Sequence, residues 1–117
     1  MLFEPEMIAR IEAGKKTTAR WPGASLRYER ARVYAIQPGG GKRHGGHILL
    51  REAHIDERGV TDFRDHMAQS EGFESAEAFL AHWGKLYPKL PPHAPVAVYR
   101  FEYLGVFGCC AGTEEGG

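Results

Sequence analysis

The sequence has little cysteine and no long apolar run. Its only two cysteines, Cys109 and Cys110, are adjacent and lie near a glycine-rich end. Neither a disulfide framework nor a four-cysteine zinc site can be built from them, so we expect free thiols, with a redox pair or an intermolecular disulfide as the alternative. The longest uncharged apolar stretch, Ala94 to Tyr99, is far too short to span a bilayer. We therefore expect a cytoplasmic protein without a membrane partner.

The chain also lacks net charge, with 15 Lys and Arg against 15 Asp and Glu, but the charge is unevenly distributed. Between Arg10 and Arg43 there are nine basic residues and only two acidic ones. Such a segment could form a local anion-binding face, or it could be a solvated surface that the acidic C-terminal half neutralises after folding.

Hydrophobic spacing and turn residues predict an α+β fold. No alternating strand and helix pattern supports a doubly wound sheet, and the short strands with wide glycine-rich connections favour a small β-barrel flanked by about three helices. At 117 residues we expect one domain over residues 1–104, followed by a flexible glycine-rich tail over 105–117. The expected helices are a segment from Pro5 to Gly14, Asp62 to Ser70 and Ser75 to Tyr87, and the expected strands are Thr17 to Trp21, Arg32 to Ile36, His47 to Ile55 and Pro95 to Tyr103. The last strand is apolar on both faces over much of its length, so we expect it to be central or to form part of a barrel.

The segment from Gly14 to Arg20 carries the densest chemistry in the chain. It places two ammonium groups, two hydroxyls and a guanidinium directly behind the first helix. These groups suit an anionic ligand rich in hydrogen-bond acceptors, such as a nucleotide or an RNA backbone. In a regular strand the side chains of Lys16, Thr18 and Arg20 would point to the same face.

Several spaced features of the chain resemble the ASCH domain, a branch of the PUA-like superfamily. They are Leu2-Phe3-Glu4-Pro5-Glu6 before a helix, Gly14-Lys15-Lys16-Thr17, a strand ending in Gln37-Pro38-Gly39, Glu71-Gly72-Phe73 before a helix that contains Trp83, and Val96-Ala97-Val98-Tyr99-Arg100-Phe101-Glu102. Together they cover about residues 1–103. The resemblance implies a PUA-like barrel whose cleft is lined by the lysine motif and faces the glutamate, and it implies RNA or nucleotide ligands.

Some small ASCH proteins are amidohydrolases that deacylate N4-acetylcytidine with a lysine, a threonine three positions later and a glutamate. The resemblance assigns these roles to Lys16 as base and Glu71 as proton donor, but Ala19 stands where the threonine nucleophile is expected. Thr18 would have to replace it. The resemblance also leaves RNA cleavage by acid–base catalysis open, with Lys16, Glu71 and nearby histidines.

Other candidate residues lie outside this motif. Trp21 could be a base-stacking platform or a core residue. Lys42 and Arg43 lie in a glycine-rich loop that could bring cations and amides to phosphates, although the loop is not a P-loop because Lys42 is not followed by Ser or Thr. We expect no metal and no cofactor, since His44, His47 and His54 lack a recognisable ligand spacing. The stripe Phe79, Leu80, Trp83, Leu86 and Tyr87 is expected to be core packing.

The leading hypothesis from the sequence is a module that binds RNA or a nucleotide. Its cleft would be formed by Lys16, Thr17, Arg20 and Glu71, with Trp21 nearby and with Lys42 and Arg43 contacting phosphates. The alternatives are an amidohydrolase or related nucleoside-processing enzyme, and a protein-interaction domain that has kept the fold and lost the site. The ligand and the oligomeric state stay open.

Overall fold

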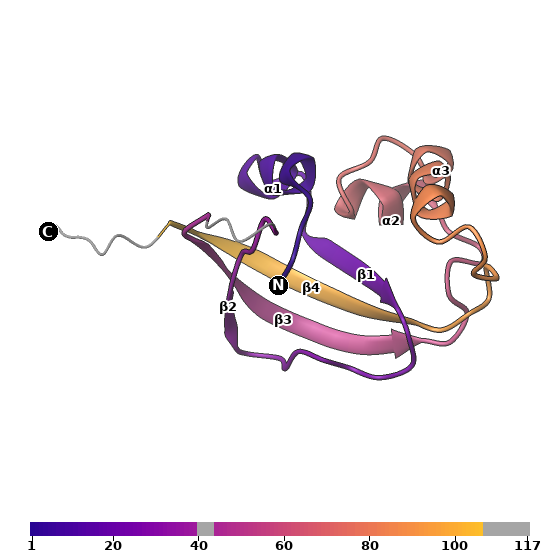
Figure 1. The fold of residues 1–117 in the computed structure, drawn as a ribbon, viewed down its shortest axis with the longest axis horizontal. Coiled ribbons are helices and arrows are strands. Elements are labelled where there is room, and N and C mark those ends of the chain that lie inside the picture. Colours follow the sequence, from indigo (N-terminus) through magenta and orange to yellow (C-terminus); the bar gives the residue numbers. More distant parts are fainter. Residues whose placement is uncertain (40–43, 107–117) are drawn as a thin grey trace, which may run out of the picture.

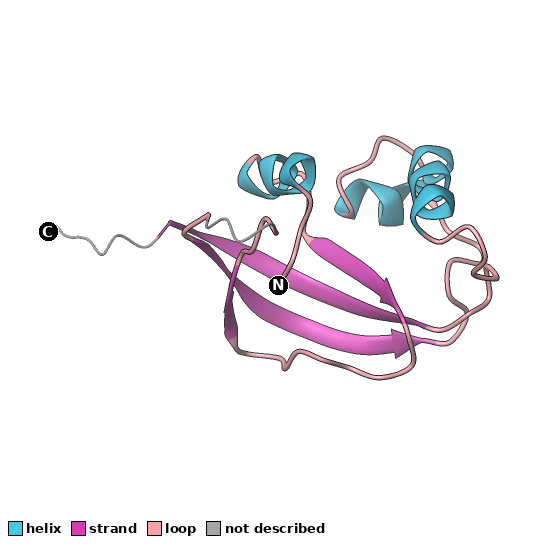
Figure 2. Cartoon of the chain, in the orientation of Figure 1, coloured by secondary structure: helices cyan, strands magenta, loops and turns pink. Residues whose placement is uncertain are grey.

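Three helices and four strands follow one another in a computed structural model that describes residues 1–39 and 44–106. They are α1 (Pro5–Glu12), β1 (Thr18–Pro22), β2 (Val33–Ala35), β3 (Gly46–Asp56), α2 (Asp65–Ser70), α3 (Ala76–Leu86) and β4 (Val96–Val106) (Figure 1; Figure 2). The order of helices and strands is the one that the sequence predicts, and the α+β class is confirmed. Within the described residues, no helix is long and apolar enough to cross a bilayer.

The four strands form one antiparallel sheet in the order β1-β4-β3-β2. β4 pairs with β1 on one side and with β3 on the other, which confirms the expectation that the last strand is central. The ladder between β3 and β4 shifts register between His47 and Ile48 and between Leu50 and Glu52. Such shifts bend a strand and increase its twist.

The expected closed barrel is not shown, since the sheet of the described residues has β1 and β2 as its two edges. Two isolated bridges extend the pairing beyond the strands, one joining Leu2 to Gln37 and the other Lys16 to Glu71. The expected tail also begins later than the sequence suggests, because β4 continues through Gly105 to Val106. The remaining residues, including Cys109 and Cys110, lie outside the described part of the chain.

Side chains on the two faces of β4 belong to two separate apolar cores. Ala97, Tyr99 and Phe101 pack in the core that contains α1, whereas Val96 and Val98 pack in the core that contains α2 and α3. Because side chains alternate along a strand, the two cores lie on opposite faces of β4. The apolar character of both faces is thereby explained.

The helix ends follow local sequence signals. Pro5 occupies the first turn of α1, and Gly14, just beyond that helix, adopts a φ of +76° that favours glycine. The Ser75 side chain caps α3 by accepting a hydrogen bond from the Ala78 amide at 3.2 Å. The α2 helix starts at Asp65, later than the sequence predicts, after Asp62 in a left-handed conformation with φ of +57°.

Candidate functional site

Three side chains from the lysine motif converge on one carboxylate at the end of α2. Glu71 Oε1 accepts from Lys16 Nζ at 3.1 Å, and Glu71 Oε2 accepts from Thr18 Oγ1 at 2.7 Å and from Arg20 Nη1 at 2.6 Å. Lys16 Nζ also donates to the Glu71 carbonyl oxygen at 3.2 Å. The expectations that Lys16, Thr18 and Arg20 share a face and that Lys16 meets Glu71 are both confirmed.

Backbone contacts hold the motif against α2. The Thr17 amide donates to the Ser70 carbonyl at 2.7 Å, and the Thr17 carbonyl accepts from the Phe101 amide at 2.9 Å. The residue after Glu71, Gly72, has a φ of +91°, and a β-carbon there would lie 3.1 Å from Arg10 Cδ and 3.3 Å from Lys16 Cβ. A glycine is therefore needed both for the backbone conformation and for the close approach of Lys16.

The charged cluster of Lys16, Arg20 and Glu71 is almost completely removed from solvent. Glu71 is 3% exposed and Lys16 is 6% exposed, and the Arg20 side chain is 7% exposed. With two cations and one anion, the cluster holds one excess positive charge. Burying charges costs several kcal/mol per ion unless partners compensate, so a second anionic or strongly polar partner would stabilise this arrangement.

The Arg20 guanidinium is the incompletely satisfied member of the cluster. Its Nε is buried and has no hydrogen-bond partner among residues 1–39 and 44–106. The Cζ atom lies 5.0 Å from the centre of the Phe63 ring, a cation–π contact that covers one side of the guanidinium plane. Buried polar groups in folded proteins are nearly always hydrogen-bonded, so a buried Nε without a partner in the described chain is unusual.

A cavity of about 350 Å³ adjoins this cluster along the edge strand β1. Its charged part consists of Lys16, Arg20 and Glu71. Further polar groups come from Glu4 and His82, whose Oε1 and Nε2 atoms lie 3.2 Å apart. The rest of the lining is mostly apolar and includes the aromatic side chains of Phe3, Trp21, Phe73, Phe79, Trp83 and Tyr87. Apolar walls with a few convergent polar groups are typical of small-ligand sites.

The structure places the other predicted site residues differently. Thr17 is exposed and lines another depression together with Arg51 and Arg100, and Lys16 borders both this depression and the cavity. Trp21 lines the cavity and also packs against Phe3, with ring centroids 6.0 Å apart. Its position is therefore compatible with both roles that the sequence left open, a stacking platform and a core residue. Lys42 and Arg43 lie outside the described residues.

Thr18 and Ala19 bear on the enzymatic alternative. Thr18 is 8% exposed and is not among the described residues that line the cavity, whereas Ala19, which does line it, is a methyl group in the α1 core. The Thr18 hydroxyl donates to Glu71, so the carboxylate rather than the Lys16 amine is next to this hydroxyl. The assignment of Lys16 as the base for Thr18 has no supporting hydrogen bond among the described residues.

Sequence reasoning missed most of the cavity wall. It interpreted Trp83 and Tyr87 as core residues, and they do pack against each other with ring centroids 4.7 Å apart, but they also face the cavity. Helical periodicity identifies a buried face and cannot separate a core from a cavity wall. Leu2, Glu4 and His82 carried no sequence signal for this site.

The histidines that were considered as metal ligands are dispersed in the structure. His44 Nε2 lies 2.9 Å from Glu12 Oε2 on the surface. In the part of the chain that the structure describes, no group of three His, Cys, Asp or Glu side chains could hold a metal ion.

Comparison with solved structures supports the resemblance to the ASCH domain. No protein-family model and no curated protein matches the sequence. The crystal structure of an ASCH domain from Lactobacillus crispatus JV V101 superposes with a TM-score of 0.65 at 13% identity, covering 86% of this chain and 71% of that chain. A crystal structure from Enterococcus faecalis V583, of the family DUF984, superposes with a TM-score of 0.64 at 15% identity, covering 87% and 72%.

These matches identify the fold of the chain. The chain has a fold similar to that of the ASCH domain, with three helices and a four-stranded antiparallel sheet among its described residues. At this level of identity the similarity concerns the fold, and the chemistry of the site must be argued from the residues of this chain.

Proposed function

We propose that this protein binds RNA or a nucleotide in the cavity beside β1, and that the cluster of Lys16, Arg20 and Glu71 recognises it. The observation that supports this most strongly is the buried Arg20 guanidinium, which lines the cavity and leaves its Nε without a partner in the described chain. A ligand oxygen bonded to Nε would remove that deficit. A phosphate or a base carbonyl would serve.

The aromatic wall suits the other half of such a ligand. The only two tryptophans of the chain, Trp21 and Trp83, both line the cavity. Nucleobases stack on aromatic side chains with a contribution of roughly 1–3 kcal/mol per base. The excess positive charge of the cluster would meanwhile attract the phosphate. Lys42 and Arg43 would extend this attraction along the backbone of an RNA.

The two tryptophans provide the readout for a direct test. Titration with the four ribonucleoside monophosphates and with short single-stranded RNA should change tryptophan fluorescence, because ligands enter between the only two fluorophores of this type. Arg20→Ala should weaken binding at least tenfold, a loss of about 1.4 kcal/mol. Arg100→Ala is the matched control, since Arg100 is an exposed arginine paired with Glu52 on the outer face of the sheet.

Salt dependence distinguishes phosphate recognition from recognition of the base alone. The affinity for single-stranded RNA should fall with salt, with a logarithmic slope of about −0.7 for each phosphate neutralised. Circular dichroism must show that Arg20→Ala is folded, and Arg20→Lys, which keeps the charge and loses Nε, should bind with intermediate affinity. Equal binding by wild type and both Arg20 variants would contradict the proposal.

One specific contact favours an amide hydrolase as a second candidate function. The Thr18 hydroxyl donates to Glu71 Oε2 at 2.7 Å, which is the spacing of a nucleophile and its proton acceptor. In this alternative Thr18 Oγ1 attacks the acyl carbonyl and gives its proton to Glu71, while Lys16 stabilises the charge on the carbonyl oxygen. Glu71 returns the proton to the amine that leaves as the C–N bond breaks, and water then hydrolyses the acyl-threonine ester and restores Thr18. Thr18 would need to become accessible from the cavity, because it does not line it in the described structure.

Incubation with N4-acetylcytidine tests the alternative. If the protein is such a hydrolase, cytidine should accumulate, Thr18→Ala should abolish the activity and Thr17→Ala, at an exposed neighbouring threonine, should keep it. Absence of cytidine with a protein that binds nucleotides would leave the binding function and remove the enzymatic one.

A further inference from the structure

A second hollow lies next to the cavity and shares a wall with it. It has a volume of about 360 Å³, and Leu2 and Trp21 line both spaces. On the far side of Trp21 it is lined by Arg27 and Tyr28 from the connection between β1 and β2. We infer that the ligand is a single-stranded nucleic acid with at least two consecutive nucleotides, one in each space, an inference that rests on the proposed function.

The volumes favour two nucleotides over one larger ligand. Each space lies near the lower end of the range for small-ligand pockets, roughly 300–1,000 Å³, so each accommodates a single base with its sugar. Trp21 lines both spaces, and its ring already contacts Phe3, Tyr28 and Tyr99. We expect the part of the ring that borders each space to contact a base there, as aromatic side chains do in single-strand binding.

The wall of the second hollow is held in place by an aromatic cluster. The Tyr28 ring contacts Trp21, Tyr34 and Tyr99, with centroid distances of 6.2, 5.0 and 5.5 Å. The Arg27 amide donates to the Tyr99 hydroxyl at 2.9 Å, which fixes the backbone beside Tyr28. A stacking surface that is already ordered costs little conformational entropy when a ligand binds.

The charges of the second hollow suit a phosphate. Arg27 is exposed, and its guanidinium has no ion-pair partner within residues 1–39 and 44–106, in contrast to Arg32, which pairs with Glu29 at 3.2 Å. No acidic side chain of the described chain lines this hollow, while Ser25 adds a hydroxyl. A peptide with an acidic side chain could use the same arginine, and the test below separates the two.

Ligand length is the variable that tests the inference. Affinities are measured by tryptophan fluorescence for uridine monophosphate, the 5′-phosphorylated dinucleotide pUpU, which has one phosphate for each nucleotide, and a 5′-phosphorylated four-uridine strand, and likewise for the other three bases. The dinucleotide should bind about tenfold more tightly than the mononucleotide for at least one base, because a second stacking contact is added. A further gain for the tetranucleotide should be smaller.

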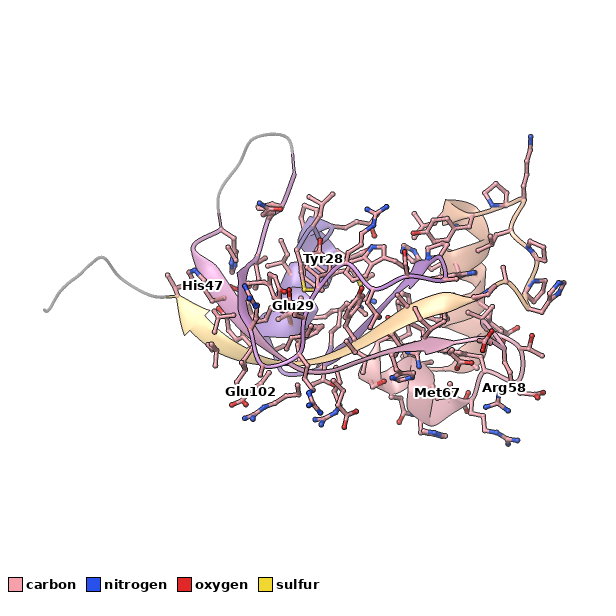
Figure 3. All side chains as sticks on the ribbon, turned by 90° about the horizontal axis from the view of Figure 1, so that it is seen from below. Tyr28, Glu29, His47, Arg58, Met67 and Glu102 are labelled. Carbon is pink, nitrogen blue, oxygen red and sulfur yellow. The ribbon has the colours of Figure 1, made fainter. Side chains whose placement is uncertain are left out.

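Two variants locate the gain in the second hollow. Arg27→Ala and Tyr28→Ala should reduce dinucleotide affinity to that of the mononucleotide and leave mononucleotide affinity unchanged. Arg58→Ala and Tyr103→Ala are the controls and should have no effect on either ligand, since neither residue lines either space. Figure 3 shows Arg58 at the end of the molecule, well away from Tyr28.

The outcomes separate this inference from the proposed function. Equal affinity for mononucleotide and dinucleotide would overturn the two-nucleotide inference and leave nucleotide binding intact. Absence of any nucleotide binding would overturn both, and binding of an acidic peptide without nucleotides would assign the surface to a protein partner instead. If Tyr28→Ala unfolds, Arg27→Ala and the length dependence still decide, because Arg27 is exposed.

Discussion

Two groups of charged side chains in this protein share the same chemistry and differ in their surroundings. At the end of α2, Lys16 and Glu71 form a pair whose side chains are 6% and 4% exposed. On the outer face of the sheet, Arg51 pairs with Glu102, and these side chains are 50% and 51% exposed. Figure 3 shows Glu102 projecting away from the sheet.

The two groups differ in exposure to solvent and in how completely their charges are paired. Across the outer face, cross-strand arginine–glutamate pairs are solvated, and the hydrogen bond and charge of Arg100 hold the pKa of Glu52 below its ordinary value. These pairs satisfy each other. Among the described residues, the buried cluster contains an extra cation and an Nε without a hydrogen-bond partner, and we propose that a ligand supplies that partner.

The largest predicted effect is the loss of the central carboxylate. Glu71→Gln leaves Lys16 and Arg20 buried without a counter-charge and should lower the free energy of unfolding by about 3–5 kcal/mol. Glu102→Gln, at the exposed pair, should lower it by about 0–1 kcal/mol. Urea unfolding followed by circular dichroism measures both.

A small effect of Glu71→Gln, equal to that of Glu102→Gln, would mean that water enters the cluster and that it is not functionally distinct from the outer face. Loss of the native fold in Glu71→Gln agrees with the account, provided that Glu102→Gln folds.

The second-largest effect on the free energy of unfolding is expected at Gly72, the residue after Glu71. Gly72→Ala and Gly14→Ala both place an alanine at positive φ, which costs about 1–2 kcal/mol. Only at Gly72 would the new methyl group also crowd Lys16 and Arg10, which should add about 1 kcal/mol or more. Unfolding free energies of the two variants give the comparison, and equal values would show that the packing around Lys16 yields easily.

A smaller effect is expected in how salt changes the coupling free energy of the exposed and the buried ion pairs. A double-mutant cycle on Arg51 and Glu102 should give a coupling free energy of about 0.2–1 kcal/mol that nearly vanishes at 1 M salt, where the Debye length is about 3 Å. The same cycle on Lys16 and Glu71 should give a coupling that salt hardly changes, because the pair is buried. A buried coupling that is screened as strongly as the exposed one would contradict the comparison.

The smallest effect is a titration at high pH. Burial, followed by the negative charge of Glu4, raises the pKa of Tyr87 above its ordinary value of 10.0. The unfolded chain therefore loses this proton first, and stability should fall as pH rises from about 10 through the higher pKa of the folded state. Absorbance at 295 nm should show that Tyr87→Phe removes a phenol that titrates above pH 10, and loss of an ordinary phenol would contradict this.

The sequence was most informative where local rules apply. The order of helices and strands, the central position of β4 and the shared face of Lys16, Thr18 and Arg20 follow from periodicity and alternation. The meeting of Lys16 with Glu71 followed from the family resemblance, since the two residues are 55 positions apart and no local rule connects them.

The parts that could not be predicted depend on tertiary packing. Trp83 lies both in the apolar core and on the cavity wall, and Leu2 reaches the cavity only because the N-terminal segment pairs with Gln37. Closure of the sheet was inferred from strand number and loop composition, which do not determine whether edge strands meet. The exposure of Thr17, by contrast, was predictable, because strand alternation places it on the face opposite to Thr18, so its assignment to the cleft was an error of local reasoning.

The side-chain NMR signal of Arg20 shows whether its Nε–H gains a hydrogen-bond partner when RNA binds. With arginines labelled by nitrogen-15, the Nε–H resonance of Arg20, assigned by its loss in Arg20→Lys, is followed while a single-stranded RNA dinucleotide is added. We expect a large shift at Arg20, whose Nε gains an acceptor, and none at Arg100. An unchanged Arg20 resonance under conditions where the dinucleotide is bound would contradict it.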